Sequence, residues 1–250
     1  MPDELHYPGQ TRSVRRSSYL LQTPDTFVRT QIPGSTGASV IVHVSPAMGA
    51  AFTQYTAEFE AGGALGEPIG ERFVYVLDGE LTLEAGSQRH TLEKDGYAFI
   101  PHGLKHALTA RETSRAAVIE RSYRGVKGVN APALLIGRES EVGGQPLMGD
   151  EALMVRGLLP DTITFDFAVN TMTYLPGASL SMVEIHVMEH GLLMLDGGGI
   201  YRLDDDWHPV TAGDFIWMAP YCPQWFGAIG KSPAKYLIYK DWNRHPLGER

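Results

Sequence analysis

Short apolar runs, in which Val, Ile, Phe, Tyr and Thr recur, dominate the chain, and long helical periodicity is nearly absent. Gly, Pro or Asp separates most runs from the next. Runs of this composition and length are typical of β-strands, and many short strands at close spacing predict an all-β barrel or sandwich. The clearest runs cover residues 39–44, 51–59, 73–77, 81–84 and 97–101.

Part of this pattern occurs twice. Residues 73–79 align with residues 191–197, and the shared Leu-Asp-Gly recurs at an offset of 118 residues, from Leu77 to Leu195. Residues 96–101 recur as 213–220 at nearly the same offset. Two copies of one β unit predict a tandem duplication. Residues 125–152 have little periodicity and several glycines and prolines, so they predict a linker. The expected organisation is an arm (1–22), a first barrel (23–124), the linker and a second barrel (153–250).

Each unit resembles a cupin. The ending Pro-x-Gly-x-x-His, which closes the second ligand strand of that family, matches residues 101–106 of the first unit. In the second unit, residues 184–190 and 213–224 match the two ligand segments. The resemblance implies a bicupin, that is, two tandem double-stranded β-helix (jelly-roll) barrels.

The second unit carries a set of candidate metal ligands. Glu184, His186 and His190 share one parity, so on an extended or gently bent strand their side chains leave by the same face. The offset of 118 residues carries His106 onto Gln224, which we take as the fourth donor. Two nitrogen and two oxygen donors without a thiolate suit Mn²⁺, Fe²⁺ or Ni²⁺ better than structural Zn²⁺. The donor types leave the choice among these ions open.

The first unit lacks this set. In the same register Arg72 stands opposite His190, Pro68 opposite His186 and Gly66 opposite Glu184. Only the last position keeps a suitable donor, His106, and one donor does not hold a metal. We therefore expect an N-terminal barrel without a metal site, which serves packing and assembly.

The last predicted strand and one aromatic residue add further candidates. Tyr236, Ile238 and Lys240 share a face, and a lysine inside a barrel is costly to bury unless it meets an anion. Lys240 would then suit a carboxylate-bearing substrate or act as an acid or base. The alternative, a solvated lysine at the strand end, is equally consistent with the residues. Tyr201, which follows the three glycines 197–199, is a similar candidate for the site. Its alternative role is that of an aromatic residue that fills the core.

Charge and cysteine content exclude several classes. The net charge is −8 and no basic run is present, which argues against nucleic acid and anionic membranes as partners. The single cysteine, Cys222, excludes an intrachain disulfide framework and a multi-cysteine zinc site, and we expect it to be a small buried residue. No apolar leader and no run of about 18 apolar residues is present, so we expect a cytoplasmic protein.

Beyond the cupin pattern, the residues resemble the (S)-ureidoglycine aminohydrolase family. The matching segments span nearly the whole chain, and the most specific feature is Glu-x-His-x-x-x-His with a late Gln in place of the usual His-x-His set. They include 45–50, 70–73, 119–123, 183–193, 199–203, 213–220, 223–225 and 239–244.

The resemblance implies a homo-oligomeric Mn²⁺ enzyme, with one ion per chain in the C-terminal barrel. It would convert (S)-ureidoglycine into (S)-ureidoglycolate and ammonia in allantoin and purine degradation. The implied residues are the metal ligands Glu184, His186, His190 and Gln224, the catalytic and substrate-binding Tyr201 and Lys240, and the substrate-binding Tyr236.

Two other functions are compatible with a bicupin. One is another metal-dependent enzyme on the same barrel, either an Fe²⁺ dioxygenase or an isomerase. Oxygen consumption would identify the dioxygenase. The other is a non-catalytic protein that binds a small ligand. That function predicts an incomplete ligand set in both barrels, whereas the second barrel here has a complete set.

Overall fold

A computed structural model describes residues 11–244 of the chain, almost all of them in strands, turns and loops. Its described residues divide into two compact units. The C-terminal unit comprises residues 11–27, 145–155 and 171–240, and the N-terminal unit comprises 28–144, 156–170 and 241–244. Within the described part of the chain, no helix has the length and apolar character needed to cross a membrane.

The N-terminal unit contains a ten-stranded sheet. Its strands lie in the order β12-β9-β6-β11-β5-β10-β7-β8, with β4 paired to β5 and β3 to β4. Alternate side chains of these strands, such as Tyr55, Val74 and Val118, form one buried core. The elements are β3 (Arg29–Thr30), β4 (Thr36–Val44), β5 (Thr53–Leu65), β6 (Glu71–Asp78), β7 (Glu80–Ala85), β8 (Gln88–Glu93), β9 (Gly96–Ile100), β10 (His106–Ala110), β11 (Ser114–Arg121) and β12 (Leu135–Arg138), with the 3₁₀ turns η2 (Pro46–Met48) and η3 (Glu139–Glu141).

The C-terminal unit is built on an eight-stranded sheet, β1-β2-β19-β16-β21-β15-β14-β13, and a three-stranded sheet, β18-β17-β20. Strands β14 and β15 belong to this unit for part of their length. The elements are β1 (Val14–Arg15), β2 (Tyr19–Gln22), β13 (Gln145–Leu147), β14 (Asp150–Gly157), β15 (Ala168–Tyr174), β16 (His190–Asp196), β17 (Gly198–Leu203), β18 (Asp206–Thr211), β19 (Phe215–Met218), β20 (Gln224–Ala228) and β21 (Ala234–Lys240), with the 3₁₀ turn η1 (Pro24–Thr26).

The two units repeat one strand topology. β6 pairs with β9 and β11, and β16 pairs with β19 and β21 in the same way. β7 pairs with β8 and β10, as β17 pairs with β18 and β20. The repeated Leu-Asp-Gly forms the same tight turn twice, because Gly79 and Gly197 adopt φ values of 78° and 63° that favour glycine. The predicted all-β duplication is therefore confirmed.

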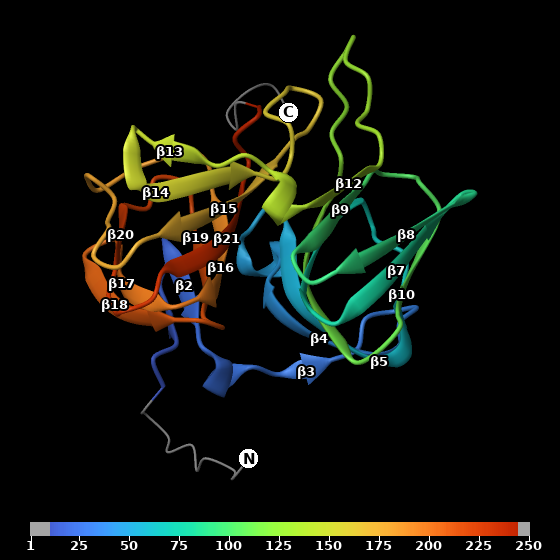
Figure 1. Ribbon diagram of the computed structural model, residues 1–250, viewed down its shortest axis with the longest axis horizontal. Helices are drawn as coiled ribbons and strands as arrows, with labels where there is room; N and C mark the ends of the chain where they lie inside the picture. Colours follow the sequence, from blue (N-terminus) through green and yellow to red (C-terminus); the bar gives the residue numbers. More distant parts are fainter. Residues whose placement is uncertain (1–10, 245–250) are drawn as a thin grey trace. The chain divides into compact units, whose positions relative to one another are not determined.

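The segment expected to be an arm forms part of the C-terminal unit. β2 lies beside β19, with Leu21 opposite Ile216 (Figure 1). Tyr19 and Leu21 are fully buried, and the Arg12 guanidinium binds both oxygens of Asp214 at 2.6 and 2.9 Å. The alternation of buried and half-buried residues in this strand is too short to stand out in a polar sequence. The expected linker likewise contains strands, β12 and β13, and residues 1–10 of the arm lie outside the described residues.

Two acidic side chains are buried together in the N-terminal unit. Glu71 is 0% and Asp166 3% exposed. Burial raises the pKa of Glu71 to about 10, and its contact with Asp166 acts in the same direction. Two buried carboxyl groups this close cannot both carry a charge without strong repulsion, so Glu71 keeps its proton.

This pair predicts a pH-dependent stability. Above the unfolded pKa of 4.5 the unfolded chain releases the Glu71 proton while the folded chain keeps it, so the free energy of unfolding falls as the pH rises toward about 10. Glu71→Gln keeps an N–H donor without a proton to lose. Its urea midpoint should fall less than that of the wild type between about pH 5 and about pH 9. The exposed Glu60→Gln is the control, and equal slopes for wild type and Glu71→Gln would contradict the prediction.

Candidate metal centre

The two segments expected to supply ligands lie side by side in the C-terminal unit. The Glu184 N–H donates to the Gln224 carbonyl at 2.8 Å, and the Gln224 N–H donates to the Glu184 carbonyl at 2.9 Å. Residues 181–189 are otherwise irregular, and His190 begins β16. The prediction of a strand over residues 184–190 is therefore wrong for most of that stretch, because bends interrupt the extended backbone. A single bridge, rather than strand parity, fixes Glu184 opposite Gln224.

Side-chain contacts link three of the four expected ligands. The Glu184 Oε2 and His186 Nε2 atoms are 3.1 Å apart, and both side chains are partly exposed. The ring centroids of His186 and His190 are 5.4 Å apart, with the planes nearly perpendicular. His190 and Gln224 are both 3% exposed and begin strands of different sheets, β16 and β20.

His190 is the residue whose surroundings fit a cation. Neither ring nitrogen makes a hydrogen bond of normal geometry, although both are buried. Burial lowers the pKa of His190 to about 3, and the charges of His186 and Lys240 act in the same direction, against a weaker effect of the Tyr239 carbonyl. A neutral buried imidazole without partners is costly, and a lone pair directed at a metal removes that cost.

Residues 11–244 contain no group of three or more His, Cys, Asp or Glu side chains arranged to hold a metal ion. The Glu184 carboxylate is paired with His186 instead of converging with both histidines. Gln224, whose amide oxygen is the fourth expected metal ligand, is not one of these four residue types. The four expected ligands together still fit a divalent ion that accepts imidazole and oxygen ligands.

Three tyrosines pack around the candidate centre. The Tyr201 hydroxyl donates to Gln224 Oε1 at 3.1 Å, and the Tyr174 and Tyr236 hydroxyls are 2.7 Å apart. All three rings contact Phe226, with centroid distances of 4.9 to 5.8 Å. Burial raises the pKa of each phenol above its usual value, so the hydroxyls stay protonated and can donate.

Lys240 ends β21 directly opposite His190. It is half-buried, and Tyr236 and Ile238, which share its face, belong to the buried core of this unit. The face that carries Lys240 is therefore the inner face of the barrel. Cys222 is 4% exposed, and burial raises its pKa to about 11, so it is a thiol at neutral pH.

Sequence reasoning missed Tyr174. Its hydroxyl partner, Tyr236, is 62 residues away in the chain, and the Tyr236 hydroxyl also lies 3.3 Å from the sulfur of Met172. A tyrosine at the end of a strand has no feature in the sequence that distinguishes it from a core residue. Only the pairing of distant strands reveals its contact.

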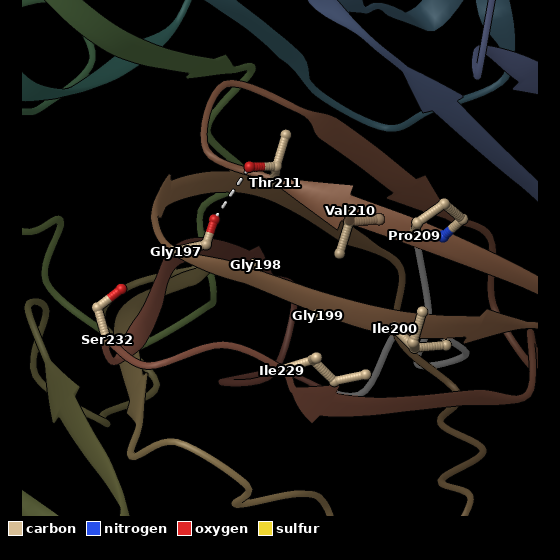
Figure 2. Close-up of a pocket in the computed structure, with 9 residues that line it drawn as sticks. All are labelled: Gly197, Gly198, Gly199, Ile200, Pro209, Val210, Thr211, Ile229 and Ser232. Atoms are coloured by element: carbon tan, nitrogen blue, oxygen red, sulfur yellow. Dashed lines mark hydrogen bonds between the residues drawn. The ribbon is translucent and has the colours of Figure 1, made fainter.

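A separate pocket of about 480 Å³ lies on β17, β18 and the segment after β20 (Figure 2). Glycines and apolar side chains such as Ile200 and Ile229 line most of it, and Thr211 donates to the Gly197 carbonyl there at 3.2 Å. None of the residues drawn in Figure 2 is titratable or a good metal ligand. The pocket therefore offers no acid–base chemistry and does not coincide with the candidate centre.

Comparison with known proteins agrees with the duplicated topology. The chain matches the cupin domain family over residues 56–120 and again over 170–239. It is therefore a protein with two cupin domains, and the second match includes Glu184, His186, His190 and Gln224.

Its relatives define a narrower family. A rice protein named probable (S)-ureidoglycine aminohydrolase is 41% identical, over 96% of this chain and 78% of its own length. The (S)-ureidoglycine aminohydrolase of Arabidopsis thaliana is 40% identical, over 96% of this chain and 81% of its own. A solved structure, a putative glyoxylate-induced protein from Pseudomonas aeruginosa, is 29% identical, covers 98% of this chain and 96% of its own, and gives a TM-score of 0.88. The chain belongs to the (S)-ureidoglycine aminohydrolase family, an enzyme family.

The tyrosine pair predicts a stability effect. Tyr174→Phe removes one hydroxyl and leaves the Tyr236 hydroxyl, which is buried, without this partner. We expect the free energy of unfolding to fall by about 1–2 kcal/mol, as measured by urea denaturation. Tyr221→Phe, at a side chain that is 55% exposed, is the matched control and should change little. Equal losses for the two variants would contradict the prediction.

Proposed function

We propose that the protein hydrolyses (S)-ureidoglycine to (S)-ureidoglycolate and ammonia, in allantoin and purine degradation. We further propose that it uses one Mn²⁺ ion held in the C-terminal barrel by Glu184, His186, His190 and Gln224. The single observation that best supports the metal is the buried imidazole of His190, both of whose nitrogens lack hydrogen bonds. The names of the relatives support the substrate.

The bound ion would supply Lewis-acid polarisation and a fixed point for orienting the substrate. The protein side chains would do the rest of the positioning. The Tyr201 hydroxyl, 3.1 Å from Gln224 Oε1, restrains the amide oxygen of Gln224. Tyr201 and Tyr236 would also contact the substrate, and because the single hydrogen of the Tyr201 hydroxyl goes to Gln224, that oxygen would act as an acceptor.

Lys240 is the proposed acid and base. The substrate carries a carboxylate and an amino group on one carbon, and an ammonium opposite His190 is well placed to bind that anion. In the reaction the bond between the α-carbon and the amino nitrogen breaks, and the oxygen of water bonds to that carbon. Lys240 gives a proton to the departing amine, which leaves as ammonia, and takes one back from the incoming water.

The test of the function is a coupled assay, because ureidoglycine is an unstable aminal. Purified protein loaded with Mn²⁺ is incubated with allantoate and an allantoate amidohydrolase. We expect ammonia release that depends on the protein, together with a single enantiomer of ureidoglycolate. A racemic product formed at the rate of the blank would contradict the proposal.

Metal removal gives a second prediction. Treatment with a chelator should abolish the activity because the ligands act only through the ion, and Mn²⁺ should restore it best among divalent ions. The assay is ammonia release after dialysis and reloading, with His190→Ala as the variant that should not recover. Recovery best with Fe²⁺, accompanied by oxygen uptake, would instead indicate a dioxygenase.

Substitution of Lys240, the proposed acid–base residue, gives a third prediction. Lys240→Met should lower kcat by about 10²-fold or more while the bound metal stays at the wild-type level. Lys235→Met is the control, because Lys235 lies on the same strand, is also half-buried and has the opposite parity. Turnover near wild type in Lys240→Met with metal bound would show that Lys240 has no such role.

Three broader expectations remain proposals. The family resemblance suggests a homo-oligomer, which light scattering on the purified protein would test. We also propose a cytoplasmic location, and a small ureide as partner without nucleic acid or membrane.

A further inference from the structure

The N-terminal barrel encloses a cation of its own. Arg72, on β6, is 1% exposed and is among the largest fully buried side chains of the described residues. Its Nη2 donates to the Gly66 carbonyl at 2.7 Å, and its Nε donates to Glu120 Oε1 at 2.8 Å. Its Nη1 lies 3.2 Å from His106 Nε2. Acceptors from three separate segments thus surround one guanidinium.

The contacts define the state of His106. A guanidinium has no acceptor, so the Nη1 of Arg72 must donate to the Nε2 of His106. The hydrogen of the ring then lies on Nδ1, which is 2.9 Å from the Leu104 carbonyl. Burial lowers the pKa of His106, and the charge of Arg72 acts in the same direction. The imidazole is therefore a neutral acceptor in one tautomer.

Glu120 supplies the opposite charge. Its Oε1 lies 2.7 Å from Nη2 of Arg72 and also accepts from the Tyr55 hydroxyl at 2.7 Å. A buried charge is stable only when it is paired and hydrogen-bonded, and Arg72 meets both conditions.

The partners of the guanidinium correspond to the expected ligands of the other barrel. At the offset of 118 residues, Gly66 corresponds to Glu184, Arg72 to His190 and His106 to Gln224. Strand pairing extends the correspondence, since β11 places Glu120 opposite Arg72 and β21 places Lys240 opposite His190. The guanidinium thus contacts Gly66 and His106, the counterparts of two expected ligands, and Glu120, the counterpart of Lys240. Glu120 is negatively charged where Lys240 is positively charged.

Backbone packing also excludes a carboxylate ligand here. A Cβ atom added to Gly66 would lie 2.3 Å from the Pro33 carbonyl oxygen, closer than real Cβ contacts occur. A glutamate at the position that corresponds to Glu184 would therefore require the backbone to shift.

We propose that the guanidinium of Arg72 is a built-in structural cation, which occupies the N-terminal barrel's counterpart of the metal position and joins β6, β10 and β11. This barrel accordingly binds no metal and needs none. The comparison of the two positions rests on the proposed metal centre, but the role of Arg72 within its own barrel does not.

The test compares urea denaturation of the full chain and its variants. Arg72→Ala removes the buried cation and leaves the half-buried Glu120, the His106 Nε2 and the Gly66 carbonyl without their donor, so the folding equilibrium constant should fall about 100-fold or more. Millimolar guanidinium should raise the urea midpoint of Arg72→Ala by filling the vacated space, and should not raise that of the wild type. The matched control is Arg29→Ala, which breaks an exposed pair with Glu58 in the same unit and should change little, with no rescue.

Several results would overturn the proposal. One is an Arg72→Ala midpoint equal to that of Arg29→Ala, and another is the absence of any guanidinium rescue. If Arg72→Ala does not fold, Arg72→Lys takes its place, because an ammonium keeps the charge but not the fork of donors. A wild-type midpoint in Arg72→Lys would then overturn the proposal.

Metal analysis provides an independent readout. The wild-type protein should hold one divalent ion per chain after loading, and His190→Ala should hold none. A second ion that persists in His190→Ala would place a metal in the N-terminal barrel and overturn the proposal. A wild-type ratio of zero would contradict the proposed metal centre alone, since the denaturation comparison decides the role of Arg72 without any metal.

Discussion

Two reciprocal backbone hydrogen bonds between Glu184 and Gln224 hold the candidate centre together. They join segments that are far apart in the sequence, in a region where no continuous ladder does so. Gln224 then opens β20, which brings its amide to Tyr201, and His190 opens β16, which brings its ring opposite Lys240. The bridge thus places Glu184 and Gln224, the bond from the Tyr221 N–H to the His186 carbonyl places His186, and strand pairing places Lys240 opposite His190.

The duplication shows how one scaffold can hold two different interiors. Strand pairing is a backbone property, so both barrels keep it while the inward side chains diverge. One barrel buries an arginine and neutralises it with Glu120, and the other buries a neutral histidine whose nitrogens have no hydrogen bonds. Removing one partner of a buried ion pair costs roughly 3–5 kcal/mol, so Arg72 and Glu120 are expected to change together or not at all.

Sequence reasoning succeeded where the signal is local or repeated. The composition and length of the apolar runs predicted the strands, and the repeated Leu-Asp-Gly predicted the duplication and the register that relates His106 to Gln224. It failed where the contact partners are distant. The strand expected at residues 184–190 is mostly irregular, the short β2 pairs with a strand near the other end of the chain, and Tyr174 meets a hydroxyl 62 residues away. The positions of the expected catalytic side chains follow from such long-range pairing, which no local pattern encodes.

The pairing of β2 with β19 has a consequence for the order of folding during synthesis. The ribosome makes residues 28–144, which carry all ten strands of the N-terminal sheet, before it has made β16, β19 or β21. During that interval β2, with its apolar Tyr19 and Leu21, can pair only with the two-residue β1, and the edge that later meets β19 has no partner. A nascent chain of this protein therefore carries an apolar strand with an unpaired edge near its start until translation is nearly finished. Chaperones are needed in such a situation, because an unpaired edge can pair with another chain.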